Sequence, residues 1–554
     1  MMTSRTAFAL CFSLILLSSQ AMSRTNIVGD SVKCMAREEV FYTVDSLRYR
    51  ISYDGPQPTA TVTDAGYGSR VPVLGDSTFI VPRSVTIGGR DYLVRKIGRQ
   101  AFAGHPEIKH LVISEGTEIV NDDAFAYCLN LESISLPATL EILAPASFRG
   151  CSAVESISIA EGNGTYDSRE GCNAIIETDK GTLVLGCKAT RIHGGVTAIG
   201  ECAFIGQQCI GSMAIPEGVK VLGCRAFADC TGLRHISLPQ SLQSIGEGAF
   251  EGCASLEEMA IPEGVREIGN SMVAGCARLG RLTVSLKNKW YDSRQDCNAI
   301  ISTQEDCLVA GCGNSVIPEG VRSIGEKAFS SSAICSIRIP ASVTQIVRTA
   351  FLHCRLCSSI EVAPGNPVYD SRGGCNAIIE TATATLIKGC GRTVIPADVG
   401  TIGDMAFCGA TMPDNLVIPE GVRSIGDNAF SDCGILTLRL PSSLQRLGNS
   451  AFSGCGRLRV VEMFGTELHL GWSVFEHCRA LCAVRLPQHI KHEGYNVFRH
   501  TPYQAVYERE YGKPYRFLSE DTHSHACHLS WVCPYGILRS QRMGDAGVQG
   551  MGVP

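Results

Sequence analysis

The chain has 554 residues, of which 45% are hydrophobic and 7% aromatic, so we expect a large core built from small aliphatic side chains. Lysine and arginine number 49 against 54 acidic residues, which gives a net charge of −5. This balance argues against a general binder of nucleic acids or anionic membranes, because such proteins normally carry a basic excess.

The N-terminus has the pattern of a secretory signal peptide, which we predict over residues 1–21. Arg5 supplies a basic start, residues 7–17 form an apolar run, and Ser19-Gln20-Ala21 resembles a cleavage site. The apolar run is too short to span a membrane, and no later segment approaches about 20 apolar residues. We therefore expect an exported protein without a transmembrane segment, located at the cell surface, secreted or periplasmic.

Residues 24–95 precede the regular repeat and are expected to form a small N-terminal β cap. The stretch 41–55 alternates apolar and polar residues, and 85–94 is typical of a hairpin around Gly88-Gly89. Such a segment would cover the open edge of the first repeat unit.

An internal repeat of 22–23 residues fills residues 96–498. One column is an Ala-Phe pair or a variant of it; Phe102, Phe125 and Phe148 are spaced by 23 residues. A second column in the same phase holds Ile-Pro or Leu-Pro. It defines about 16 rungs from Ile113 to Leu486, with Ile80 as a candidate start of a seventeenth.

The unit that begins at Cys253 indicates how each rung folds. Leu256, Met259 and Ile261 follow an L-x-x-L-x-L pattern, which points alternate side chains of a short strand inward. Pro262 ends the strand because it has no N–H to donate. A unit of this length cannot close a core alone, so the units must stack into a mainly β leucine-rich-repeat solenoid.

Many of the 27 cysteines are in phase with the repeat. Phase rather than pairing organises this set, so we predict buried thiols that pack as small hydrophobes with a weak S–H donor. The residues are Cys128, Cys151, Cys230, Cys253, Cys276, Cys354, Cys433, Cys455 and Cys478.

Pro-Glu-Gly turns at Glu217, Glu263, Glu319 and Glu420 are each followed, one rung later, by a neutral turn. Like charges stacked on adjacent strands are destabilising. We interpret the alternation as a contribution to solubility and not as a metal-binding stripe.

Three rungs are enlarged by about ten residues, and each contains the sequence motifs YDSR and CNAII. The Phe-to-Phe interval there is 56 residues in place of 23, as from Phe148 to Phe204. We predict that the additional residues form a hairpin that projects from the rung, with Asp179-Lys180 as the turn in the first copy.

The YDSR residues have the chemistry of a reactive site, but no histidine keeps a fixed spacing to the hairpin cysteines. We therefore predict no catalytic residue, cofactor site or metal site. An architectural hairpin and a repeated contact surface for a ligand remain as interpretations. The candidate contact residues are Tyr166, Asp167, Arg169, Tyr291, Asp292, Arg294, Tyr369, Asp370 and Arg372.

Each hairpin also carries two cysteines fifteen residues apart. If the two lie opposite one another across the hairpin, a disulfide is compatible with the spacing, and so are two packed thiols. The pairs are Cys172 with Cys187, Cys297 with Cys312, and Cys375 with Cys390.

The unit IPEGVRSIGDNAFSDCGILTLRLPSSLQRLGNSAFSGC (418–455) closely resembles the BspA-like, treponemal-type leucine-rich repeats. The YDSR-x-x-CNAII words resemble a longer variant in exported proteins of Bacteroidetes. The resemblance covers roughly residues 80–498. It implies a curved solenoid, export and, in some members, adhesion to host proteins or other cells; it supplies no catalytic residues.

Residues 499–554 are expected to cap the last rung and then to form a disordered tail. The tail contains His523, His525, Cys527, His528 and Cys533, a composition that can bind Zn²⁺ but in a spacing that matches no standard site.

These patterns predict a non-enzymatic, adhesin-like scaffold that binds a host or neighbouring-cell protein or glycan and no nucleic acid. A self-associating structural component of the envelope is the alternative, and a glycan-binding surface protein is a more distant one.

Overall fold

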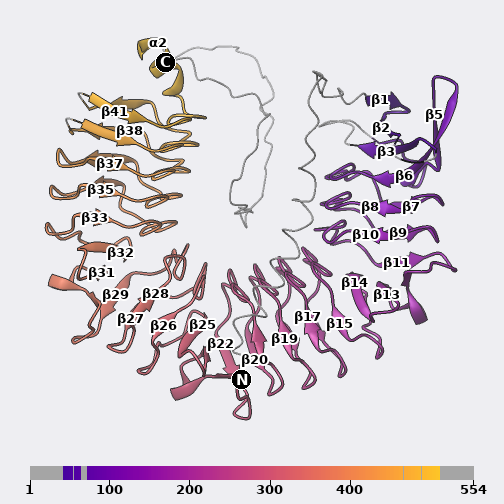
Figure 1. The fold of residues 1–554 in the computed structure, drawn as a ribbon, viewed down its shortest axis with the longest axis horizontal. Helices are drawn as coiled ribbons and strands as arrows, with labels where there is room; N and C mark the ends of the chain where they lie inside the picture. The colour runs from indigo at the N-terminus through magenta and orange to yellow at the C-terminus, as the bar shows by residue number, and fades with distance from the viewer. Residues whose placement is uncertain are drawn as a thin grey trace, which may run out of the picture. The chain divides into compact units, whose positions relative to one another are not determined.

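A computed structural model describes residues 41–53, 55, 57–63, 71–465, 467–487 and 489–511. The predicted signal peptide, residues 1–21, and the His/Cys-rich tail lie outside this part of the chain. The described part consists of short strands joined by turns, and successive rungs stack in chain order from the N-terminal strands to β41 (Figure 1).

Most rungs contribute one strand to each of two parallel ladders; the rungs at Ile192, Ile317 and Ile395, which follow the three hairpins, have no long strand. The long-strand ladder holds the Ile-Pro or Leu-Pro column and consists of the sheets β4-β7-β9-β11, β16-β18-β20-β22, β27-β29 and β34-β36-β38-β40. Its strands are β4 (Thr78–Val81), β7 (His110–Ile113), β9 (Ser133–Leu136), β11 (Ser156–Ile159), β16 (Ser212–Ala214), β18 (His235–Ser237), β20 (Glu258–Ile261), β22 (Arg281–Val284), β27 (Ser336–Ile339), β29 (Ser359–Val362), β34 (Asn415–Val417), β36 (Thr437–Leu440), β38 (Val460–Met463) and β40 (Ala483–Arg485).

The short-strand ladder follows the turn after each proline. Most of its strands have two residues, and they pair in parallel with the equivalent strand one rung away. The strands are β8 (Ile119–Val120), β10 (Ile142–Leu143), β15 (Ala198–Ile199), β17 (Val221–Leu222), β19 (Ser244–Ile245), β21 (Glu267–Ile268), β26 (Ser323–Ile324), β28 (Gln345–Ile346), β33 (Thr401–Ile402), β35 (Ser424–Ile425), β37 (Arg446–Leu447), β39 (Glu467–Leu470) and β41 (His489–Glu493).

The N-terminal segment continues the short-strand ladder, in the order β1-β2-β3-β6-β8-β10. Its strands are β1 (Phe41–Val44), β2 (Leu47–Ser52), β3 (Thr59–Thr63), β5 (Ser84–Ile87) and β6 (Arg90–Ile97). The predicted hairpin is confirmed as β5-β6, and its turn residues Gly88 and Gly89 have φ of 60° and 77°. This left-handed backbone is one that glycine adopts without steric cost.

The first rung begins one residue later than the sequence indicates. Val81, not Ile80, pairs with Ile113 of the next strand. Val81 is fully buried, whereas Ile80 is 44% exposed. Successive side chains of a strand point to opposite faces, so the one-residue shift places Ile80 outside the core.

The Ala-Phe column forms a ladder of stacked rings on the side of each rung away from the two strands. The centroids of Phe407 and Phe430 are 4.7 Å apart and those of Phe430 and Phe452 5.1 Å apart, with the rings within 5° of parallel. The nine in-phase cysteines are buried free thiols, as predicted. Each donates its S–H to the carbonyl of the ladder phenylalanine one rung earlier, as Cys455 does to Phe430 at 3.2 Å.

The Pro-Glu-Gly carboxylates connect neighbouring turns. Glu217 accepts the backbone N–H groups of Gln240 and Ser241 in the next rung at 2.8 and 3.1 Å. Glu319 and Glu420 accept equivalent bonds. The alternation of acidic and neutral turns therefore has a hydrogen-bonding role, because the neutral turn donates to the carboxylate; a contribution to solubility stays a prediction.

Helix α2 (Gln504–Tyr511) follows the last rung. Tyr503 and Tyr507 pack against Phe498, with ring centroids 5.1 and 5.0 Å away. These contacts cover the last ring of the phenylalanine ladder, at the place where the sequence predicts a C-terminal cap.

Candidate functional site

The three enlarged rungs contain the predicted hairpins, but their strands do not project: the central strand is buried, and the last strand pairs in parallel with the next short strand. Each hairpin consists of a two-residue strand, a 3-10 turn and two antiparallel strands, and the predicted turn at Asp179-Lys180 lies between β13 and β14. The elements are β12 (Tyr166–Asp167), η1 (Arg169–Gly171), β13 (Ala174–Glu177) and β14 (Thr182–Gly186); β23 (Tyr291–Asp292), η2 (Arg294–Asp296), β24 (Ala299–Ser302) and β25 (Cys307–Gly311); and β30 (Tyr369–Asp370), η3 (Arg372–Gly374), β31 (Ala377–Glu380) and β32 (Thr385–Gly389).

The tyrosine of YDSR ends the preceding short-strand sheet. The hydroxyl oxygens of Tyr166, Tyr291 and Tyr369 accept the backbone N–H groups of Leu143, Ile268 and Ile346 at 3.1, 3.0 and 3.1 Å. These donors lie in β10, β21 and β28, the last strands of their sheets. The phenol thus replaces the carbonyl of a missing strand. Burial raises the pKa of Tyr291 and Tyr369.

The aspartate and arginine of YDSR pair with each other. Arg372 donates through Nε and Nη2 to Asp370 at 2.8 and 2.6 Å, and Thr381 donates to the same carboxylate at 2.9 Å. These bonds hold the pKa of Asp370 below its usual value. The remaining guanidinium nitrogen of Arg372 reaches Asp398 at 2.7 Å.

Asparagines act as further caps, one in each hairpin three residues before the tyrosine and a second, Asn298 or Asn376, in the second and third hairpins. Asn298 accepts the N–H of Leu282 at 2.7 Å and donates to the carbonyl of Gly280 at 2.8 Å, which satisfies the last strand of a long-strand sheet. Asn288, three residues before Tyr291, donates to the carbonyls of Pro262 and Val265 at 2.8 Å. Sequence reasoning missed this asparagine, although Asn163, Asn288 and Asn366 all stand three residues before the tyrosine.

The central strand of each hairpin separates two parts of the core and packs against one of them on each face. In β13 the side chain of Ile175 packs into the cluster before the hairpin, and those of Ala174 and Ile176 pack into the cluster after it. The strands β24 and β31 alternate in the same way, so the hairpins divide the core into four consecutive clusters. A strand buried on both faces explains the continuous apolar letters of CNAII.

The spacing is compatible with hairpin cysteines that lie opposite one another, but in the structure they do not. A β-bulge between Ile175 and Ile176 shifts the pairing by one residue, so that Ala174 pairs with Gly186 and Cys172 lies beyond the partner of Cys187. The same bulge occurs in the other two hairpins.

The structure differs from the candidate disulfides in that all six hairpin cysteines are free thiols: Cys172, Cys187, Cys297, Cys312, Cys375 and Cys390. The members of each pair pack into different core clusters, because the central strand separates them. In the structure these residues are packed thiols, and a disulfide in any of the three pairs stays a prediction.

Cys312 and Cys297 illustrate how the two cysteines of one hairpin are separated. Cys312 packs into the cluster before its hairpin, whereas Cys297 packs into the cluster after it. The Sγ atom of Cys312 accepts the side-chain N–H of Asn298 at 3.2 Å and the hydroxyl of Ser315 at 3.5 Å. Cys312 is thus engaged as a buried hydrogen-bond acceptor and not in the disulfide that its spacing from Cys297 allows.

The candidate contact residues are engaged within the hairpins. Tyr166 and Tyr369 are buried, and the Asp-Arg pairs bond to each other and to neighbouring turns. These contacts favour the architectural interpretation, while a contact role for these residues stays a prediction.

A thiol and an imidazole meet outside the hairpins. The Sγ atom of Cys408 lies 3.9 Å from Nε2 of His353. Burial raises the pKa of Cys408 to about 12 and lowers the pKa of His353. Both groups are therefore neutral near pH 7, unlike the thiolate that a cysteine nucleophile requires.

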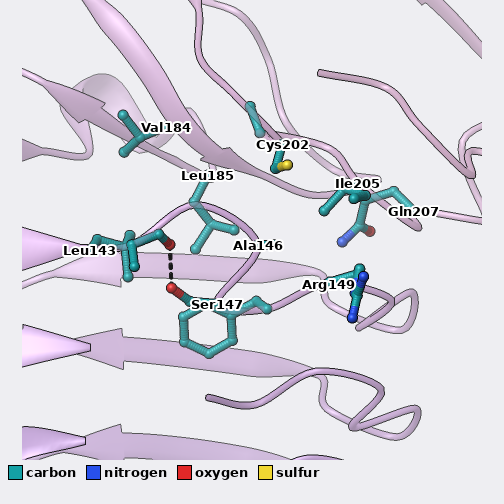
Figure 2. A pocket seen from close by; sticks show the side chains of 12 residues that line it. Leu143, Ala146, Ser147, Arg149, Val184, Leu185, Cys202, Ile205 and Gln207 are labelled. Carbon is teal, nitrogen blue, oxygen red and sulfur yellow. Dashed lines mark hydrogen bonds between the residues drawn. The ribbon is translucent and has the colours of Figure 1, made fainter. Parts of the chain in front are cut away.

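A small, partly open cavity of about 10 Å³ lies where the first hairpin joins the next rung. Arg149 and Gln207 lie at one end and Leu143 at the other (Figure 2). Ser147 donates to the carbonyl of Ala144 at its edge. This volume admits about one water molecule and no organic substrate.

An open groove of about 660 Å³ runs along the sheet β16-β18-β20-β22. Small exposed side chains, Ala214, Ser237 and Ala260, lie on its floor. Met213 and Ile236, which occupy core-facing positions of their strands, are only half-buried there. Sequence reasoning missed the groove; the available signal was the run of small residues one position before Ile215, Leu238 and Ile261.

Stacked 22–23-residue rungs, two parallel ladders and an internal ring ladder define a leucine-rich-repeat solenoid. The model of the BspA type leucine rich repeat region matches six copies over residues 85–173, 186–296, 310–369 and 389–504, which is more than half of the chain. The chain therefore belongs to this family. The unmatched intervals between these ranges contain the central strands of the three hairpins.

Several solved structures are similar to the chain. A leucine-rich cell surface protein of Faecalibacterium prausnitzii is 24% identical, with a TM-score of 0.39, over 76% of this chain and 94% of that chain. A leucine-rich repeat protein of Bacteroides ovatus is 20% identical, with a TM-score of 0.30, over 83% and 92%. The pneumococcal vaccine antigen PcpA is 14% identical, with a TM-score of 0.35, over 78% and 93%.

No curated protein matches the chain significantly. Within the described residues, no helix has both the length and the apolar character needed to cross a membrane.

Proposed function

We propose that the chain is an exported, non-enzymatic scaffold that binds a macromolecule of a host or neighbouring cell through the groove on β16-β18-β20-β22. The observation that carries the proposal is the groove itself, where half-buried Met213 and Ile236 reach the surface beside small side chains. A partner that covers these two side chains removes apolar surface from water, which is the main driving force in most protein association.

The rim of the groove adds polar specificity. His235 and Glu258 line it, and Ser212, Thr283 and Ser285 supply hydroxyl groups. Apolar side chains such as Met213 and Ile236 among polar ones are typical of protein interfaces. The family is one of repeat scaffolds, which supports a protein as the partner, and adhesion is the form of this role that the predicted export suggests.

A binding screen of the purified protein against matrix proteins, mucins and envelope glycans tests the proposal. We expect Ala260→Arg and Ser237→Arg to abolish binding of a partner found in the screen, because the long side chains fill the groove. Ser135→Arg is the matched control, since Ser135 has the equivalent position in β9, outside the groove. Equal losses in all three variants, or none, would contradict the assignment of the groove.

Light scattering distinguishes this function from the alternative, self-association of the chain. Concentration-dependent assembly in light scattering that is blocked by Ala260→Arg would identify a second copy of this chain as the occupant. That outcome would replace the adhesin-like function by a self-associating envelope component.

A further inference from the structure

The left-handed column two residues after each ladder phenylalanine carries an unusual pair of side chains in its last two rungs. Glycine occupies many rungs of this column, with φ of 69–77° as at Gly409 and Gly275, and aspartate, serine or tyrosine take several others. His477 and His500 occupy it in consecutive rungs, with φ of 61° and 58°. His353 also lies in the column, but the next rung there has Gly409.

The backbone brings the two imidazoles together. The N–H of His477 donates to the carbonyl of Arg499 at 3.0 Å, and the ring centroids of His477 and His500 are 4.5 Å apart with 23° between the planes. The rungs, rather than a flexible loop, therefore fix the separation of the two ring systems.

A carboxylate completes the cluster. The Oε1 atom of Glu476 lies 3.8 Å from Nε2 of His477 and 3.8 Å from Nδ1 of His500. One ligand atom from each of the three residues lies within 4.8 Å of the others. The Glu476 side chain is 17% exposed, whereas the histidines are about half exposed, at 48% and 50%. An ion can thus enter from solvent and meet a carboxylate held by the protein.

We propose that Glu476, His477 and His500 form a binding site for a divalent transition-metal ion, with Zn²⁺ as the best match. Two imidazole nitrogens and one carboxylate oxygen are a ligand set that Zn²⁺ accepts, with a fourth position left to water or to a ligand from a partner molecule. Ligand atoms of a tetrahedral zinc site are about 3.3 Å apart, so small side-chain rotations suffice. Magnesium and calcium prefer all-oxygen sites and fit this set poorly.

One positively charged side chain, that of Arg499, competes with the metal ion for the carboxylate of Glu476. Nη1 of Arg499 lies 3.7 Å from Oε1 of Glu476, and this partly exposed guanidinium must move away from the carboxylate when a metal binds. Arg499→Gln should therefore tighten metal binding, which is opposite in sign to the effect of losing a ligand.

Calorimetric titration with Zn²⁺ tests the site in the full chain, first with His523, His525, Cys527, His528 and Cys533 replaced so that the tail does not contribute. We expect one Zn²⁺ per chain, weakened at least about tenfold by His500→Gln or Glu476→Gln. His235→Gln is the control, because its imidazole is similarly exposed but has only Glu257 nearby, at 4.0 Å.

Absence of binding to the tail-substituted chain, or equal affinities of the His500→Gln and His235→Gln variants, would overturn the proposal. Co²⁺ gives a readout that needs no ligand variant. The tail-substituted chain should show visible bands of low-symmetry nitrogen and oxygen coordination without sulfur-to-cobalt charge transfer. Spectra of free hexaaqua Co²⁺, or with thiolate bands, would also overturn it.

Discussion

Tyr291 and Asn298 each take the place of a missing strand. One accepts the last N–H group of a short-strand sheet, and the other satisfies the last strand of a long-strand sheet. Buried backbone groups without partners are costly, so these side chains allow the sheets to stop inside the solenoid. The tyrosine of YDSR is thus used for backbone capping, while its aspartate and arginine bond to each other.

Tyr291→Phe removes only the acceptor for the N–H of Ile268. We expect it to lower the free energy of unfolding by about 1 kcal/mol, since a partly buried donor loses its partner. Urea denaturation measures the difference. Tyr495→Phe, in an exposed ring, is the control and should be neutral; equal stability of both variants would contradict the capping role.

Asp370→Asn tests the Asp-Arg pair through its pH dependence. The pKa of Asp370 is lowered in the folded protein by its bonds to Arg372. A lowered folded pKa contributes stability above the unfolded pKa, and this contribution is lost as the pH falls through the folded value. The wild-type protein should therefore exceed the variant in stability at pH 7 and lose that advantage below pH about 4.

Denaturation curves of both proteins between pH 7 and pH 3 measure this dependence. Asp179→Asn, in the exposed turn of the first hairpin, should show no such change in the difference. A stability gap for Asp370→Asn that persists unchanged in acid would mean that the carboxylate charge is not its cause.

At the scale of elements, each hairpin separates two core clusters, and a glycine of its last strand contacts the phenylalanine ring of the next rung. A Cβ atom on Gly186, Gly311 or Gly389 would lie 2.2 Å from Cε1 of Phe204, Phe329 or Phe407. This close approach explains the glycine that precedes the second hairpin cysteine. The ring can continue the ladder only because no side chain stands there.

Gly389→Ala should destabilise the protein by about 1–3 kcal/mol, because the methyl group overpacks against the ring of Phe407. Phe407→Leu in the same chain should recover part of the loss in a double-mutant cycle. Gly400→Ala is the control, since a Cβ atom there meets nothing within 4 Å. Additive effects of the Gly389 and Phe407 changes would refute the contact.

At the scale of the whole molecule, the described cysteines differ in exposure, with Cys202 and Cys307 intermediate between the extremes. Cys209, Cys224, Cys335 and Cys482 are exposed, while the nine in-phase cysteines are buried. The buried set lies against the phenylalanine ladder in every cluster of the core, so its reactivity reports on unfolding of the solenoid.

Differential alkylation with peptide mapping should label the four exposed cysteines rapidly and the in-phase cysteines only after denaturation. The same maps test the hairpin pairs, since a disulfide between Cys172 and Cys187, Cys297 and Cys312, or Cys375 and Cys390 would appear as linked peptides. Rapid labelling of Cys253 or Cys455 in the native protein would contradict the buried ladder.

The repeat phase alone predicts the rungs, the inward leucine column, the phenylalanine column and the buried cysteines. This succeeds because every rung meets the same neighbours, so a residue in phase has the same environment in each copy. Ile80 shows the limit of the method. At the first rung no earlier copy defines the phase, and a one-residue shift reverses which side chain is buried.

The sequence by itself determined the solenoid, its three enlarged rungs and its family, because these depend on periodicity along the chain. Tertiary structure decided how the enlarged rungs are built and where the groove and the cluster of Glu476, His477 and His500 lie. The bulge at Ile175-Ile176 separates Cys172 from Cys187, and stacking brings His477 to His500 and exposes Met213 beside Ile236. Such outcomes depend on local shifts of pairing and on contacts between rungs, which a spacing of 23 residues does not specify.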